Sequence, residues 1–234
     1  MMTTLPYAVT DAVGLPETRL PEDLLTQLPE TVAAAPWHTR DCRVMNWLHP
    51  VAAEALSCFP EQIRPTGDVI VAWALVEYGD TPVGPYSEIA ATLLPTEGDG
   101  YGHIPFIVVD SPASVVGGRA NWLLPKALAR FDWSEGGHSV TVTNEQPEAP
   151  AWSITVAVTP TGNTTALTVP NHIQQVSADG DVRRFDGELN GKMQSATFDV
   201  AGQADGPLGA LLKSGRFDGT ILTDCDFLVG PLNS

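Results

Sequence analysis

Short segments in which apolar residues alternate with polar ones, separated by glycine and proline, dominate the chain. The segment Asp68–Tyr78 is apolar on both faces, which is typical of a strand buried on both sides of a sheet. In Tyr86–Leu94 the alternation places Tyr86, Glu88 and Ala90 on one face. The pattern predicts further strands at His103–Val109, Ser139–Thr143, Trp152–Val158, Thr164–Val176, Val182–Leu189, Lys192–Val200 and Arg216–Val229.

Signals for helices are few and short. Pro50–Phe59 begins with proline, carries an apolar stripe and stops at Pro60, which predicts a short helix. Ser111 before Pro112 has the pattern of an N-cap, and that helix should end before Pro125. A third short helix is expected over Pro207–Lys213. Many short strands with few helices favour a barrel or a sandwich.

Turn-forming residues set the expected organisation of the chain. Leu-Pro recurs four times in residues 1–36, which predicts an irregular N-terminal arm with one helical turn near Leu24. Residues 37–234 are expected to form a single domain. The pair Asn190-Gly191 predicts a hairpin turn between two strands. Gln146–Pro150 is expected to be a hairpin loop rather than a linker between domains.

Composition and charge narrow the class of protein. The chain is 43% hydrophobic and 17% charged, which is typical of a globular protein with a core. The formal net charge of −16 makes nucleic acid or an anionic membrane surface an unfavourable partner. No signal-peptide pattern or apolar run of membrane-spanning length is present, so a cytoplasmic location is expected.

Metal and disulfide chemistry find no support in the sequence. The three cysteines lie far apart and form no CxxC pair, so they indicate neither a disulfide framework nor a zinc site. The five histidines show no HxxxH or HxH spacing. Gly117-Gly118-Arg119 lacks the remaining residues of a phosphate-binding loop.

Lysine is scarce, and one of the three lysines has unusual neighbours. Lys126 follows Trp-Leu-Leu-Pro and precedes Ala-Leu-Ala, surroundings that can remove water from an ammonium group and lower its pKa. Making half of a free lysine neutral at pH 7 takes a pKa shift of about 3 units, which documented burial effects reach. An amine nucleophile needs such a shift, although a lysine with an apolar stem and an exposed head is the alternative.

Two segments together resemble the acetoacetate decarboxylase family. Arg119 is followed six residues later by Pro125-Lys126, the spacing of the family's Gly-Arg and Pro-Lys pairs. Tyr86-Ser87-Glu88 matches the family's Tyr-[Ser/Thr]-Glu segment, with Glu88 lying 38 residues (126 − 88) before Lys126. The resemblance implies that Lys126 forms a Schiff base and that Glu88 lines the active site.

The chain departs from the family pattern at two positions. Ala127 stands where family members typified by the decarboxylase have a second lysine directly after the catalytic one. A second carboxylate of the family site would fall by register near Trp73, an apolar residue. Without the second lysine, desolvation is expected to be what activates Lys126.

The resemblance also implies a fold and a reaction. The fold expected is β-rich α+β, with a strongly bent antiparallel sheet closing into a barrel around a small apolar cavity. Because the family commonly forms homo-oligomers, at least a dimer is expected, with a small-molecule keto acid as the ligand. The reaction expected is cofactor-independent decarboxylation of a β-keto acid such as acetoacetate. Aldol condensation and dehydration of 2-oxo acids such as pyruvate, or non-catalytic binding of a small molecule, are the alternatives.

The remaining site residues expected are substrate-binding. Tyr86 belongs to the matched segment, and Trp122 is expected in the core or in the pocket wall. Arg119 is expected either to bind a substrate carboxylate or to hold Glu88 or a backbone carbonyl. Arg40 aligns loosely with an N-terminal arginine near the family's active site, or is a plain surface arginine.

Overall fold

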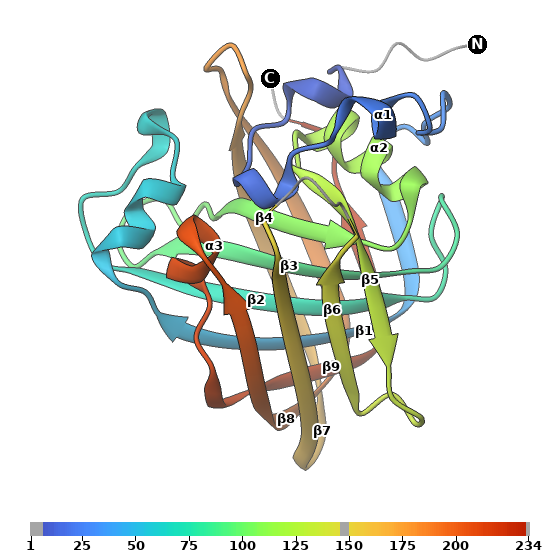
Figure 1. Cartoon of the computed structure of the whole chain (residues 1–234). Helices are drawn as coiled ribbons and strands as arrows, with labels where there is room; N and C mark the ends of the chain where they lie inside the picture. The colour runs from blue at the N-terminus through green and yellow to red at the C-terminus, as the bar shows by residue number, and fades with distance from the viewer. Residues whose placement is uncertain (1–6, 146–149, 233–234) are drawn as a thin grey trace.

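A computed structural model of the chain describes residues 7–145 and 150–232, and within them nine strands form one sheet. Each strand pairs with the next along the chain and β9 pairs with β1, so the sheet closes into a barrel (Figure 1). The strands are β1 (Trp37–Pro50), β2 (Val69–Tyr78), β3 (Tyr86–Pro95), β4 (His103–Val109), β5 (Lys126–Trp133), β6 (Ser139–Asn144), β7 (Trp152–Val176), β8 (Val182–Ala204) and β9 (Gly215–Val229).

The expected β-rich α+β fold is confirmed, with one exception to antiparallel pairing. Strands β4 and β5 run parallel, and helix α2 (Pro112–Trp122) makes the crossover between them. Ser111 caps α2 as predicted, because its Oγ accepts a hydrogen bond from the Ser114 N–H. Parallel strands need a crossover connection of this kind, and the end of α2 sets the position at which β5 begins.

The other helices are short. They are α1 (Glu22–Leu25), α3 (Gly206–Leu211) and the 3-10 helices η1 (Val9–Asp11), η2 (Pro16–Thr18), η3 (Ala53–Cys58) and η4 (Glu61–Ile63). Residues of η3 and α3 pack into the main core. The predicted turn near Leu24 is α1, the predicted helix over 50–59 is the shorter 3-10 helix η3, and the one over 207–213 is α3. No helix in the described ranges has the length and apolar character needed to span a bilayer.

The two faces of β1–β3 have different surroundings. The face with Trp47, Trp73 and Ile89 packs into the main core, where the rings of Trp47 and Trp73 stack with centroids 5.9 Å apart. The opposite face carries Tyr86, Glu88 and Ala90, as the alternation predicted, and borders a cavity. One side of these strands therefore supplies the core, and the other is left for a site.

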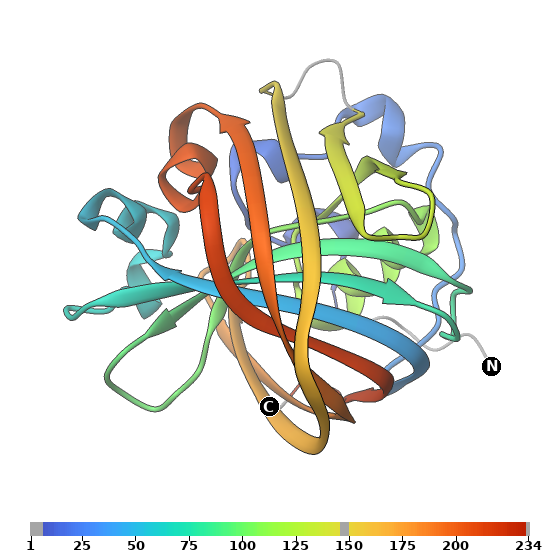
Figure 2. The same ribbon diagram turned by 90° about the horizontal axis from the view of Figure 1, so that it is seen from below.

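The β7–β8 pair is the longest element and closes the far side of the cavity. The two strands pair over their whole length, with Trp152 opposite Ala204 at one end and Val176 opposite Val182 at the other. They cross β1–β3 steeply (Figure 2). The turn predicted at Asn190-Gly191 is wrong, because β8 runs straight through both residues with only a register shift against β9. The loop predicted at 146–150 has its first four residues outside the described part of the chain.

Two strands, β1 and β5, were not predicted. In β1 the residues at 39–43 are mostly polar and carry an irregularity, with Asp41 at φ 51°, so the alternation is broken. In β5 only three residues pair with β4 before the strand turns to β6. Their strand character comes from pairing with distant segments rather than from a local pattern.

The N-terminal segment lies over α2 and one end of the barrel (Figure 1). Leu15 is buried in the main core, and its N–H donates to the carbonyl of Pro105 in β4. Glu17 and Thr18 are buried with it. The segment therefore covers the β4–α2–β5 crossover rather than projecting into solvent.

Acid should destabilise the fold through His103. This side chain is 2% exposed, and burial lowers its pKa from 6.5 to about 4. The unfolded chain therefore binds a proton more readily between these values, so stability is present at neutral pH and lost as the pH falls from about 6.5 towards 4. Between pH 7.5 and 4, wild-type protein should lose about 3 kcal/mol of unfolding free energy more than His103→Leu does.

Urea denaturation of both proteins at each pH measures this difference. The comparison isolates His103 because the other titrating groups, including buried Glu17, are common to both proteins. Equal losses in the two proteins would mean that His103 is not held neutral by burial.

Candidate active site

Lys126 is placed by the end of α2. The helix ends at Trp122, and Leu123 adopts the left-handed conformation (φ 57°) with its N–H bonded to the Arg119 carbonyl. Pro125 cannot continue the helix, and Lys126 begins β5 opposite Ile107 of β4. The lysine side chain is 5% exposed. It is not a lysine with a buried stem and a head in water.

Three oxygen atoms surround the Lys126 ammonium group. Its Nζ donates to Glu88 Oε2 at 2.7 Å, to Ser114 Oγ at 3.0 Å and to the Tyr86 hydroxyl at 3.4 Å. Its Nζ also lies 5.2 Å from the centre of the Tyr86 ring, within the range of a cation–π contact. The three donors of an ammonium group are thus all used, and the charge is compensated by one carboxylate.

Glu88 is held in turn by a second tyrosine. The Tyr78 hydroxyl donates to Glu88 Oε1 at 3.2 Å, and the rings of Tyr78 and Tyr86 stack with centroids 4.5 Å apart. The two tyrosines face each other directly across the β2–β3 ladder. Both carboxylate oxygens of Glu88 therefore have a partner, and the lysine–glutamate pair is fixed from both sides.

Gly118 makes room for the lysine. A Cβ at this position would lie 2.5 Å from Lys126 Cδ and 2.7 Å from Cε. A Cβ at Gly117 would lie 2.4 Å from the Trp37 ring. The Gly-Gly pair therefore serves close packing of α2 against β5 and Trp37, and any larger residue at 118 would displace the lysine.

Arg119 binds the backbone rather than the cavity. Its Nε donates to the Lys126 carbonyl at 2.6 Å, and its Nη atoms donate to the carbonyls of Thr18 at 2.5 Å and Val9 at 3.1 Å. Burial lowers its pKa to about 10, which leaves it charged at neutral pH. Of the two roles expected for Arg119, the geometry matches the one in which it holds backbone carbonyls.

The pKa of Lys126 moves in the direction opposite to the expected one. Burial acts to lower it, but the Glu88 carboxylate and Tyr86 act together to raise it, and the net effect is a raised pKa. Burial raises the pKa of Tyr86 to about 12, so its hydroxyl stays protonated. The resting site is therefore an ammonium–carboxylate pair rather than a free amine.

The pair lies at one end of a cavity of about 430 Å³. Its wall includes Tyr78, Tyr86, Trp122 and small or aliphatic side chains from β1–β3 and β7–β9. Among the described residues that line it, Lys126 is the sole lysine or arginine. A substrate anion would thus meet one cationic group, already paired.

Trp122 and Arg40 have different positions. Trp122 lines the cavity, with its Nε1 donating to the Gly230 carbonyl at 2.7 Å and its ring edge-on to Trp37. Arg40 is exposed and lies 3.9 Å from the Asp80 carboxylate, and it is not part of the cavity wall. The structure thus brings together Lys126, Glu88, Tyr86 and Trp122 but not Arg40.

The two positions at which the sequence departs from the pattern it resembles, Trp73 and Ala127, both lie in the main core. Val76 lies directly across the ladder from Glu88, and Trp73 points into the core on the opposite face. Ala127 is fully buried in that same core. A residue at 127 therefore faces away from Lys126, and Glu88 is the charged group that sets the lysine's ionisation.

Ser114 and Tyr78 belong to the site but were not predicted. Ser114 is a fully buried polar residue one turn into a buried helix, and such a hydroxyl requires a partner. Tyr78 ends β2 on the face shared with Tyr86. Alternation along β2 would have indicated its face, but not its contact with Glu88.

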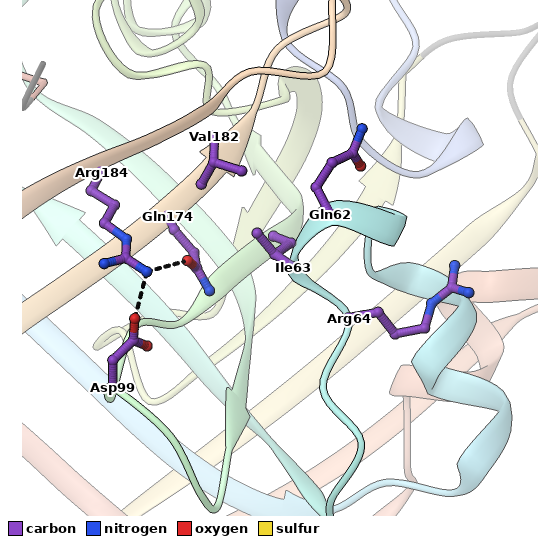
Figure 3. Close-up of a pocket in the computed structure, with 7 residues that line it drawn as sticks. All are labelled: Gln62, Ile63, Arg64, Asp99, Gln174, Val182 and Arg184. Atoms are coloured by element: carbon purple, nitrogen blue, oxygen red, sulfur yellow. Dashed lines mark hydrogen bonds and ion pairs between the residues drawn. The ribbon is translucent and has the colours of Figure 1, made fainter.

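A second, larger hollow of about 630 Å³ lies on the surface beside η4 (Figure 3). Among the residues that line this hollow, Arg184 donates to Asp99 at 2.5 Å and to Gln174 at 3.3 Å, and Arg64 donates to the Phe59 carbonyl at 3.1 Å. It contains no buried ionisable group. Across residues 7–145 and 150–232, no three histidine, cysteine or acidic side chains lie close enough to hold a metal ion.

A buried lysine paired with a carboxylate, on the wall of a cavity in a closed β-barrel, is the candidate site of this chain. The model of the acetoacetate decarboxylase (ADC) family matches residues 26–185, more than half of the chain, and the chain belongs to this family. The curated proteins contain no match.

Several solved structures share the fold. An acetoacetate decarboxylase is 16% identical with a TM-score of 0.55, covering 91% of this chain and 96% of that one. The acetoacetate decarboxylase of Legionella pneumophila is 14% identical with a TM-score of 0.53, covering 88% and 90%. The enduracididine biosynthesis enzyme MppR, complexed with pyruvate, is 18% identical with a TM-score of 0.55, covering 87% and 90%. At these identities the likeness concerns the fold.

Removing the charge of Glu88 should lower the pKa of Lys126. Burial lowers the pKa of Lys126, and the Glu88 carboxylate is the main group that raises it. In Glu88→Gln that carboxylate is gone, so the pKa of Lys126 should fall by about 1–3 units. Competitive acetylation across pH, read by peptide mass spectrometry, gives the apparent pKa of each lysine. Exposed Lys213 in the same sample should be unchanged and serves as the control. An unaltered midpoint at Lys126 would contradict the assigned role of Glu88.

Proposed function

We propose that the chain is a cofactor-independent lyase that decarboxylates a β-keto acid through a Schiff base on Lys126. The observation that carries this proposal is the buried Lys126–Glu88 pair at the closed end of an apolar cavity. A buried amine with an adjacent proton acceptor is the arrangement that imine formation requires.

The first step is a proton transfer within the pair. Lys126 Nζ lies 2.7 Å from Glu88 Oε2, so the ammonium proton can pass to the carboxylate and leave a neutral amine beside a neutral acid. When an apolar substrate displaces water from the cavity, the neutral pair becomes less unfavourable relative to the charged one. By accepting the proton, Glu88 produces the neutral Lys126 amine, which from the sequence was expected to arise by desolvation alone.

The amine then attacks the ketone carbon. Two protons of the original ammonium leave with the ketone oxygen as water, and a protonated imine remains on Lys126. The bond between the α-carbon and the carboxylate breaks, and its electron pair moves into the imine to give an enamine and CO₂. A proton from solvent, relayed through Glu88, then adds to the enamine carbon, and hydrolysis of the resulting protonated imine returns a methyl ketone and the Lys126 ammonium.

The apolar wall favours decarboxylation over the alternative reaction. A carboxylate without a cationic partner is destabilised in an apolar site, and loss of CO₂ relieves that cost. In aldol condensation and dehydration of a 2-oxo acid such as pyruvate, the carboxylate persists and needs a partner throughout. Arg119 is engaged by three carbonyls and Arg40 lies outside the wall, so neither is assigned this role.

Borohydride trapping tests the proposal. Protein incubated with acetoacetate or pyruvate, reduced and digested, should carry a substrate-derived adduct on Lys126 and none on Lys192 or Lys213. Lys126→Ala should give no adduct, and acetoacetate should release CO₂ faster than the spontaneous reaction only with wild-type protein. An adduct with pyruvate alone would favour the aldol reaction. No adduct with a wider panel of ketones would favour a non-catalytic binder.

A further inference from the structure

The cavity floor beyond Glu88 is made of small side chains. On the cavity face of the β2–β3 ladder, Ala74 lies directly opposite Ala90 and Ala72 directly opposite Thr92. The opposite face of the same strands carries the large side chains Trp73, Leu75, Ile89 and Leu93. Two successive rows of small pairs therefore form a depression in the floor, here called the trough (Ala72, Ala74, Ala90 and Thr92).

The trough is long and begins at the reactive pair. The row Val76–Glu88 is followed by Ala74–Ala90 and then Ala72–Thr92. Four residues separate the first and last rows, which is about 13 Å along the strands. Since each C–C bond of about 1.5 Å advances an extended chain by about 1.3 Å, this length matches a chain of about ten carbons.

The walls over the trough are mainly apolar. Trp37, Trp122 and Phe185 form a buried aromatic cluster on one side, and Leu167, Leu189 and Met193 of the β7–β8 pair line the other. The polar groups Tyr78, Tyr86, Glu88 and Lys126 gather at one end. Leu48, which lines the other end of the cavity, is 48% exposed. Asn46, which pairs with Ala74 across the β1–β2 ladder, and Asn171 and His172 of β7 also line the cavity, so the lysine and the carboxylate lie at one end of a lining that is otherwise mainly apolar.

The volume is large for a four-carbon acid. Cavities of about 300–1,000 Å³ typically hold ligands of drug size, and this one measures about 430 Å³. We propose that the substrate is a β-keto acid whose ketone carries an extended apolar chain of about six to ten carbons, which lies in the trough while Lys126 reacts with the ketone. This inference rests on the proposed function and specifies its substrate class.

A chain-length series tests the trough. The rate constant kcat/KM is measured for 3-oxo acids from four to twelve carbons, below their aggregation limits. It should rise about two- to fourfold for each added methylene until the trough is filled, mainly through a falling KM. If kcat/KM does not change with chain length while acetoacetate still forms an adduct on Lys126, the inference about the trough is wrong and the proposed function stands.

Two filling variants locate the chain. Ala74→Leu should abolish the rise in kcat/KM for substrates whose chain extends past the Ala74–Ala90 row. Ala72→Leu should abolish it only for chains about five carbons longer, which reach the Ala72–Thr92 row. Ala166→Leu, exposed on the β7–β8 pair and outside the wall, should leave the whole profile unchanged. If Ala74→Leu and Ala72→Leu change the oligomeric state but not the dependence of kcat/KM on chain length, the trough serves contacts between copies of the chain and the proposal is wrong.

A binding measurement separates this inference from the chemistry. Lys126→Ala cannot form an imine, yet 2-undecanone should still quench tryptophan fluorescence at micromolar concentrations, because Trp37 and Trp122 line the cavity. Acetone should have no effect at the same concentrations. Quenching without any Lys126 adduct in wild-type protein would refute the proposed function but not the trough, and absence of quenching would refute the trough.

Discussion

The ion pair between Lys126 and Glu88 is the constraint on which the surrounding structure depends. A buried charge is costly unless it is paired and hydrogen-bonded, and breaking such a pair typically costs about 3–5 kcal/mol. The chain meets this requirement with Ser114, Tyr86 and Tyr78, and with the space that Gly118 leaves for the lysine stem. The β4–α2–β5 crossover, held by Arg119, brings these groups together.

The same strands that hold the pair divide the molecule into a core and a site. Large side chains on one face of β1–β3 fill the barrel, and small ones on the other face leave the cavity. Core packing and the cavity thereby lie on opposite faces of the same strands, so the cavity can stay open without weakening the core. The placement of Ala127 in the core follows from the same alternation, and it leaves Glu88 to control the ionisation of Lys126.

Sequence patterns predicted the parts of the site that depend on local order. Alternation placed Glu88 on one face with Tyr86 and Ala90, the family resemblance assigned it to the active site, and the cap at Ser111 predicted the start of the helix before Lys126. The pKa direction of Lys126 could not be predicted, because the 2.7 Å contact with Glu88 joins two different strands and is absent from local hydrophobicity. Strand β1 and the continuity of β8 through Asn190 were missed for a related reason: pairing with neighbouring strands overrode the local signals.

Incorporation of oxygen-18 from labelled water into the ketone product tests the central claim most directly. Imine formation on Lys126 expels the ketone oxygen as water, and hydrolysis replaces it with solvent oxygen. A single turnover of wild-type protein in labelled water should therefore give fully labelled ketone, whereas the spontaneous reaction over the same time should give little label. Enzymatic product that retains the original oxygen would contradict a Schiff base on Lys126.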